Sequence, residues 1–148
     1  MAICFNNYGA FLCELGQYEA AQRQFRAAGR SSEPGAKADS FDNSGYCYLK
    51  AQKMAEARKA LIQAVTEDVG KGPPMLLEAS QRIQQGKYAQ ARLLLDVYEL
   101  CVPLTAESLW LEIRFAALEG RSDDLKSYAT QTSAKFSTIV TVPAIFSQ

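Results

Sequence analysis

The side chains with the greatest chemical potential in this sequence are its four cysteines. They stand at Cys4, Cys13, Cys47 and Cys101, and no two of them lie within four residues of each other. Zinc sites usually take paired ligands from such short spacings, so the pattern does not predict a metal site. For Cys4 and Cys101 we expect buried free thiols that serve as small apolar filler.

Few residues in this sequence are candidates for general acid–base catalysis. The sequence contains no histidine, which removes the usual general base, a common zinc ligand and every Ser–His or Cys–His pair. A carboxylate hydrolase would have to rely on residues such as Glu14, Glu19 and Asp42. These are explained more simply as solvated charges on helix faces. We therefore expect no enzyme activity and no cofactor.

The charge balance bears on which partners are possible. There are 16 basic and 16 acidic residues among 148, so no excess of cations is available to neutralise phosphates or anionic lipids. No stretch approaches the roughly 18 uninterrupted apolar residues of a membrane span. The segment 1–9 lacks the basic and apolar parts of a signal peptide. We expect one domain with a protein partner, no nucleic acid and no membrane span.

The elements that position these residues follow a repeat. Gly16, Gln52, Gly86 and Gly120 recur at spacings of 36, 34 and 34 residues. A small residue followed four positions later by a large one recurs in frame after the first three turns, as Ala21 and Phe25, Ala57 and Leu61, and Ala91 and Leu95. A period of 34 residues is typical of tetratricopeptide repeats, in which two helices form each unit. The small residues let the two helices approach, and the large ones fill the space between units.

The sequence therefore predicts an all-α tetratricopeptide-repeat superhelix, or α-solenoid, of about four units in residues 1–136. The units are expected near 2–35, 38–71, 72–105 and 106–136. Their helices are expected near 3–15, 18–30, 37–50, 54–67, 73–85, 88–101, 104–119 and 122–135. The fourth unit is the weakest match, because Leu125 and Ala129 replace its small-then-large pair. A generic helical bundle is the alternative, but it does not explain three copies in frame.

Two short stretches carry a more specific signal. Residues 6–13 read Asn-Asn-Tyr-Gly-Ala-Phe-Leu-Cys, and residues 45–47 read Gly-Tyr-Cys. In these motifs the chain resembles the type IV pilus biogenesis and stability protein family, the pilotin-like PilF/PilW group. The resemblance runs from about Asn6 to about Phe136 and includes the segment 109–120.

The resemblance implies a non-enzymatic scaffold that assists type IV pilus biogenesis through assembly or stability of the secretin channel. Members are lipoproteins on the periplasmic side of the bacterial outer membrane. Because this sequence shows no signal peptide, lipid-bearing cysteine or first repeats, we expect it to be truncated at the N-terminus. Membrane anchoring would then come only from the missing lipidated segment. A cytoplasmic repeat adaptor or co-chaperone of another pathway is the alternative.

The resemblance also bears on two of the cysteines, because some members carry the same pair. The repeat register places Cys13 and Cys47 at nearly equivalent heights on the first helices of adjacent units. We expect them to form a disulfide in an oxidising compartment.

Repeat stacks of this type bind peptides in a groove lined by the first helix of each unit. The usual groove positions map here onto Asn6, Asp42, Tyr46, Leu49, Leu76, Ile83, Trp110 and Arg114, with Ala10, Ser80 and Ala117 nearby. This set is mostly apolar, which suits a hydrophobic strand or an amphipathic helix. A carboxylate clamp would need several cations and amides, and only Asn6 and Arg114 qualify. For Tyr46, Leu49, Ile83 and Trp110, a place in the core is the alternative.

The C-terminal segment 137–148 is uncharged and rich in β-branched residues, and Pro143 would interrupt a helix there. One explanation is disorder or a frame error in the gene. The other is that this tail docks in extended form on an apolar groove, its own or a neighbour's, which could produce a homodimer.

Overall fold

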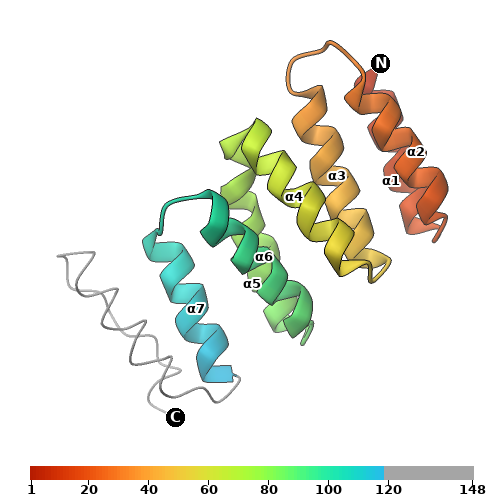
Figure 1. Ribbon diagram of the computed structural model, residues 1–148. Coiled ribbons are helices and arrows are strands. Elements are labelled where there is room, and N and C mark those ends of the chain that lie inside the picture. The colour runs from red at the N-terminus through yellow and green to blue at the C-terminus, as the bar shows by residue number, and fades with distance from the viewer. Residues whose placement is uncertain (119–148) are drawn as a thin grey trace.

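The computed structural model describes residues 1–118, and every regular element in that range is a helix (Figure 1). The elements are α1 (Ala2–Glu14), α2 (Tyr18–Gly29), α3 (Ala36–Lys50), α4 (Met54–Glu67), a short 3-10 helix η1 (Val69–Lys71), α5 (Gly72–Gln84), α6 (Tyr88–Cys101) and α7 (Ala106–Leu118). They follow one another in chain order from α1 at one end of the stack to α7 at the other. The predicted all-α class is confirmed, and these seven α-helices agree with the predicted ranges to within two residues.

Several predictions fall beyond the described part of the chain. The eighth helix, expected near 122–135, lies outside the described residues, as do Gly120, Leu125 and Ala129 of the fourth unit. The tail 137–148 and the dimer expected from it lie there too.

Each helix pair packs closely because one residue at the crossing is very small. A Cβ atom added to Gly9 of α1 would lie 2.5 Å from the Phe25 ring of α2. A Cβ added to Gly45 of α3 would lie 2.5 Å from Leu61 Cγ of α4. Ala79 of α5, the third residue in this register, is fully buried. The alternation of small and large residues in the sequence therefore sets the spacing within each pair.

The turns inside the pairs share one backbone conformation. Gly16, Gln52 and Gly86 have φ angles of 77°, 63° and 75°, which lie in the left-handed region. In each case the residue after the turn donates its backbone N–H to a carbonyl five positions earlier, as Gln17 does to Leu12 at 2.9 Å. This is the hydrogen bond of a Schellman helix end, for which glycine is preferred. Gln52 adopts the same conformation with a side chain attached.

The junction between the first two units is made by small and polar side chains. Ser40 of α3 donates its hydroxyl to the Phe25 carbonyl of α2. Ser44 Oγ donates to Gln22 Oε1 at 2.5 Å, and Gln22 Nε2 donates to the Ser44 carbonyl at 3.1 Å. Gln22 and Ser40 are buried, so these hydrogen bonds lie within the junction and join α2 to α3.

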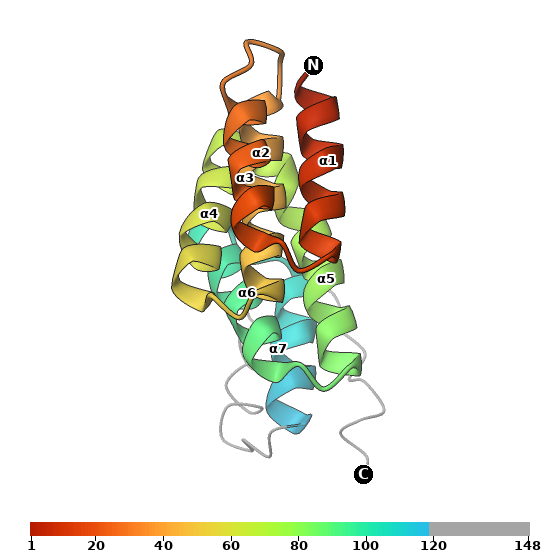
Figure 2. The same ribbon diagram turned by 90° about the vertical axis from the view of Figure 1, so that its right-hand side faces the viewer.

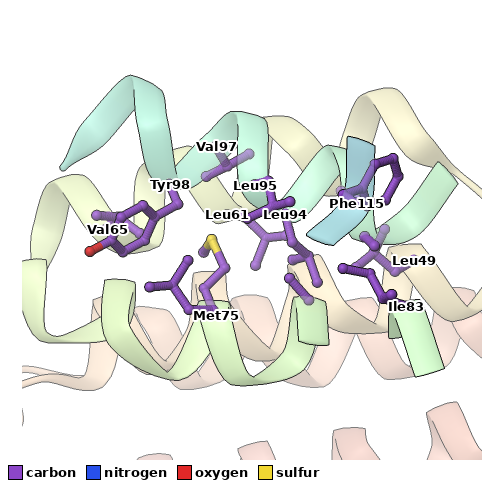
Figure 3. Close-up of a cluster of buried hydrophobic side chains, with 14 residues drawn as sticks. Leu49, Leu61, Val65, Met75, Ile83, Leu94, Leu95, Val97, Tyr98 and Phe115 are labelled. Carbon is purple, nitrogen blue, oxygen red and sulfur yellow. The ribbon is translucent and has the colours of Figure 1, made fainter. Parts of the chain in front are cut away.

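The junction between the second and third units is apolar. Figure 3 shows Leu61, Leu94 and Leu95 in the middle of a buried cluster, with Val65 and Tyr98 toward one end and Leu49, Ile83 and Phe115 toward the other. These side chains come from α3, α4, α5, α6 and α7. Burial of so many large residues is the main stabilising contribution at this junction, at about 1.5–3 kcal/mol for each.

The stack has two distinct sides. In Figure 2, α1 and α5 lie along one side, and α2 and α4 lie along the other. The groove predicted on the first helices would therefore lie on the side of α1 and α5.

Candidate functional site

The predicted groove residues fall into rows along the first helices. Asn6, Asp42, Leu76 and Trp110 occupy one position of the repeat register in α1, α3, α5 and α7. The second row lies one helical turn further along and consists of Ala10, Tyr46, Ser80 and Arg114. We call the surface made by these two rows the first-helix face.

Three of the predicted groove residues belong to the core instead. Leu49, Leu76 and Ile83 are 0%, 8% and 3% exposed, and all three belong to the apolar cluster of Figure 3. The second and third units close against each other at these positions, so the side chains fill the junction and a partner cannot reach them. Leu49, Leu76 and Ile83 are therefore core residues, and the expectation that they line a groove was wrong.

The other five predicted residues, Asn6, Asp42, Tyr46, Trp110 and Arg114, are half-buried. Arg114 Nη1 of α7 lies 3.5 Å from Ser80 Oγ of α5, which places these two members of the second row side by side. Their role in binding stays a prediction.

A pocket of about 450 Å³ opens beside the second row, between the first two units and the turn of the third. Ala10 and Glu14 line it from α1, Tyr46 and Lys50 from α3, and Arg82 from α5. Lys50 bridges the pocket's edge through an ion pair with Glu14, with an Nζ–Oε2 distance of 2.5 Å. The first-helix face therefore contains a recess large enough to take side chains of a bound peptide.

Arg82 organises the far wall of this pocket, and the sequence reading missed it. Its guanidinium lies 5.6 Å from the centre of the Tyr46 ring and pairs with Glu78 one turn earlier. Its Nε also donates to Gln90 Oε1 at 3.0 Å. These contacts hold Tyr46 and Arg82 in fixed positions. Its place beside the expected groove residue Ile83 does not reveal this role, because adjacent residues of a helix point in different directions.

Two lysines that the sequence analysis did not single out also line the pocket. Lys50 and Lys87 both line it, together with Arg82, against the single carboxylate of Glu14. Lys50 stands four residues after Tyr46, so helical periodicity would have placed it on this face. The pocket is thus more cationic than the apolar groove that the sequence predicted.

Burial changes the titration of two residues on this face. Burial of Asp42 raises the pKa of its carboxyl from 3.8 to about 6, although Lys71 acts in the opposite direction. Burial also raises the pKa of the Tyr46 hydroxyl well above its usual range. Asn6 Oδ1 and Asp42 Oδ1 are both buried without a hydrogen-bond partner in the part of the chain that the structure describes. Asp42 is therefore not the solvated carboxylate that the sequence led us to expect.

The cysteines divide into a bonded pair and two free thiols. Cys13 of α1 and Cys47 of α3 are joined in the structure, with Cα atoms 6.0 Å apart. That separation lies in the usual range for a disulfide, so the fold permits the predicted bond. Cys101 is half-buried, whereas Cys4 is exposed on α1. The expectation of a buried Cys4 was wrong, because its helix face turns away from α2.

One carboxyl group, that of Glu99, has a raised pKa of the kind found in catalytic acids. Burial and a hydrogen bond with Glu112 raise the pKa of Glu99 to about 8. The Glu112 side chain is 1% exposed and pairs with Arg92. The buried Glu112 joins α7 to α6 through its ion pair with Arg92, whereas Glu99 lies exposed near the end of α6. Among residues 1–118, no group of three or more Cys, Asp or Glu side chains could hold a metal ion.

Sequence comparison gives two relatives. The chain is 28% identical over 126 residues to the type IV pilus assembly protein PilF of Pseudomonas aeruginosa, a match that covers 85% of this chain and 50% of that protein. It is 45% identical over 49 residues to an uncharacterised protein of Haemophilus influenzae, covering 33% of this chain and 27% of that protein. No protein-family model matches the chain.

Two solved structures share the fold. A structure of Pseudomonas aeruginosa PilF superposes with a TM-score of 0.52 at 26% identity and covers 94% of this chain. The crystal structure of PilW, described as a widely conserved type IV pilus biogenesis factor, gives a TM-score of 0.55 at 24% identity over the same share. This chain is thus similar to PilF and PilW, which are type IV pilus biogenesis proteins.

The likeness covers only part of these proteins. The chain spans half the length of the PilF sequence, and 63% and 64% of the two solved chains. The likeness to PilW at 24% identity concerns the fold alone. No helix among residues 1–118 combines the length and apolar character that crossing a membrane requires.

Proposed function

We propose that this chain is a non-enzymatic scaffold that holds a protein segment on its first-helix face and thereby assists type IV pilus biogenesis. The observation that carries the proposal is the double likeness to PilF, in sequence over 126 residues and in fold over 94% of the chain. Fold alone would name a scaffold without a function, so the sequence likeness is essential.

The pocket beside Tyr46 supports the binding part of the proposal. Ala10 leaves room at one wall, Tyr46 offers a ring, and Lys50, Arg82 and Lys87 supply hydrogen-bond donors. A peptide could place an apolar side chain on the ring and a carboxylate or carbonyl oxygen near the cations. The peptide would bind non-covalently, through shape complementarity and a few polar contacts.

A finer version of the proposal names the partner and the compartment. The partner would be the secretin, or another pilus component, on the periplasmic side of the outer membrane. The Cys13–Cys47 pair supports this compartment, because disulfides persist in the bacterial periplasm and are rare in the cytosol.

The proposal can be tested with a substitution that fills the pocket and leaves the packing contacts of the fold in place. Ala10 is exposed, so Ala10→Arg places a long side chain in the pocket while α1 keeps its packing. Ala89→Arg is the matched control, since Ala89 is an exposed alanine on α6. Each variant replaces the chromosomal copy in a piliated bacterium that carries this gene, and surface pili and secretin multimers are measured.

We expect Ala10→Arg to reduce both readouts strongly and Ala89→Arg to leave them at the parental level, with equal amounts of each variant in the cell. Loss of pili with normal secretin multimers would keep the pilus role and remove the secretin as partner. Normal pili in the Ala10→Arg strain would overturn binding at this pocket.

A further inference from the structure

A second recess lies on the side of the second helices, between α2 and α4, with α3 as its floor. It consists of two adjacent hollows of about 240 and 210 Å³, which share Gln22, Arg26 and Tyr48 in their walls. Because the hollows share these residues, they lie side by side, and we treat them together as one groove. We call it the second-helix groove; it is separate from the pocket beside Tyr46.

The walls of this groove carry unpaired positive charge. Arg23 and Arg26 line it from α2, and Lys53 and Lys59 line it from the start and the middle of α4. In the described part of the chain none of these four cations forms an ion pair or a side-chain hydrogen bond, whereas Lys37, Lys50, Lys71, Arg82 and Arg92 all form ion pairs. Four of the described cations without an ion pair therefore lie together in this groove, whereas Arg30, Arg58 and Lys87 lie elsewhere.

Two carboxylates, Glu19 and Glu56, also line the groove, which leaves four cations against two anions and an excess of two positive charges. The whole chain is neutral, so this excess is a local feature and not a consequence of overall composition. A recess lined by one sign of charge concentrates ligands of the opposite sign.

The floor of the groove is aromatic and held in place. Tyr48 and Phe41 of α3 lie along it, both half-buried. The hydrogen bonds between Gln22 and Ser44 fix α2 against α3 directly at the floor. The groove therefore needs little reorganisation to accept a ligand. Because its wall is already ordered, the binding of a ligand carries a smaller entropic cost.

We propose that the second-helix groove binds an acidic segment of a protein partner. The carboxylates of the segment would lie against Arg23, Arg26 and Lys59, and an apolar side chain would lie on the Tyr48 and Phe41 rings. A narrow recess with a ring floor suits a peptide chain. A flat anionic membrane would touch only its rim and would also meet Glu19 and Glu56.

The test uses a labelled peptide in which glutamate alternates with phenylalanine and leucine, and a matched peptide with lysine in place of each glutamate. The proteins are the full chain, the double variant Arg26→Glu/Lys59→Glu, and the control Arg30→Glu. Arg30 is an exposed cation that follows α2 and lies outside the groove. Binding is measured by fluorescence anisotropy at low and high salt, and melting temperatures are measured for all three proteins.

We expect the acidic peptide to bind the full chain, to lose about tenfold or more in affinity for the double variant, and to bind more weakly as salt rises. Arg30→Glu should change the affinity by less than about twofold. A double variant that no longer melts cooperatively is replaced by Arg26→Gln/Lys59→Gln, for which about a threefold loss is expected.

Three results would overturn the proposal. The first is that the acidic and lysine peptides bind equally well. The second is that the double and control variants lose the same affinity for the acidic peptide. The third is that neither peptide binds, whereas vesicles of anionic phosphatidylglycerol do. The first-helix pocket is unaltered in all of these variants, so failure here leaves the proposed function standing. Retention of peptide affinity in Ala10→Arg would confirm that the two sites are separate.

Discussion

The first and second junctions of the stack join similar units in different ways. Between the first two units, Ser40, Ser44 and Cys47 of α3 face α2 and α1 through hydrogen bonds and a sulfur bridge. Between the second and third units the contacts come from large apolar side chains such as Leu61 and Leu95. The first junction combines a small apolar cluster around Phe25 with bonds between a few atoms, whereas the second depends mainly on buried apolar area.

The first-helix face changes character along the same direction. Asn6 and Asp42 occupy the row position in the first two units, and Leu76 and Trp110 occupy it in the next two. The polar pair is half-buried, whereas Leu76 joins the core. The repeat register sets the position of a residue on its helix, and the type of side chain then determines whether that position is exposed or buried. Pockets therefore open around the first junction, where the side chains are small.

The largest effect is expected from truncation in the apolar junction. Leu95 is fully buried, so Leu95→Ala should lower the free energy of unfolding by about 4 kcal/mol through lost burial and the cavity left behind. Leu15→Ala is the control, because Leu15 is 57% exposed and its truncation should cost little. Urea denaturation measures both. A loss below about 1 kcal/mol for Leu95→Ala would mean that this junction does not depend on buried area.

The next effect concerns the sulfur bridge of the first junction. If Cys13 and Cys47 are bonded in the native protein, reduction should lower the free energy of unfolding by about 3 kcal/mol, because the bond closes a loop of 34 residues. The experiment uses Cys4→Ser/Cys101→Ser protein, which leaves only this pair. Equal denaturation midpoints with and without reductant, or two free thiols in oxidised protein, would contradict the bond.

A similar effect is expected at Asp42. The folded protein raises the pKa of this carboxyl from 3.8 to about 6, so the folded state binds a proton more tightly than the unfolded state. The associated stability is present below about pH 4 and is lost as pH rises through 6. Asp42→Asn should therefore stabilise the protein at pH 7 by about 3 kcal/mol and have little effect near pH 4. Thermal melts across this range test it, and a constant difference between the two proteins would refute it.

The smallest expected effect on stability concerns the turns inside the helix pairs. Gln52 has a φ of 63°, which glycine adopts with less strain, so Gln52→Gly should stabilise the protein by about 1 kcal/mol. The reciprocal change Gly86→Gln should cost a similar amount, because the added Cβ would meet open space and only the backbone would be strained. Melting temperatures that move in the same direction for both variants would show that the turns are not equivalent.

The sequence predicted the repeat well because its signal is local. The spacing of Gly16, Gln52 and Gly86 marks turns that the structure places in one left-handed conformation. The small residues Gly9 and Gly45 stand where the helices touch. Such features depend on neighbours within one unit, so they can be read from the order of residues.

The candidate site was harder to predict, because it depends on contacts between units. Leu49 and Ile83 have groove positions in the register, but both are buried in the apolar cluster where the second and third units meet. Arg82 and Lys87 enter the pocket from the third unit, and no local pattern marks them as neighbours of Ala10. The burial of Asp42 likewise follows from the packing of α3 in the stack and not from its neighbours in sequence.

The proposed function requires a pilus component to bind beside Ala10 on the first-helix face. Photocrosslinking in living cells tests this contact, with a photoreactive amino acid placed at Ala10 or, as the control, at Ala89. We expect the secretin or another pilus-assembly protein to be captured at position 10 and not at position 89. Capture of the same protein at both positions, or capture of no envelope protein at position 10 in cells that make pili normally, would contradict it.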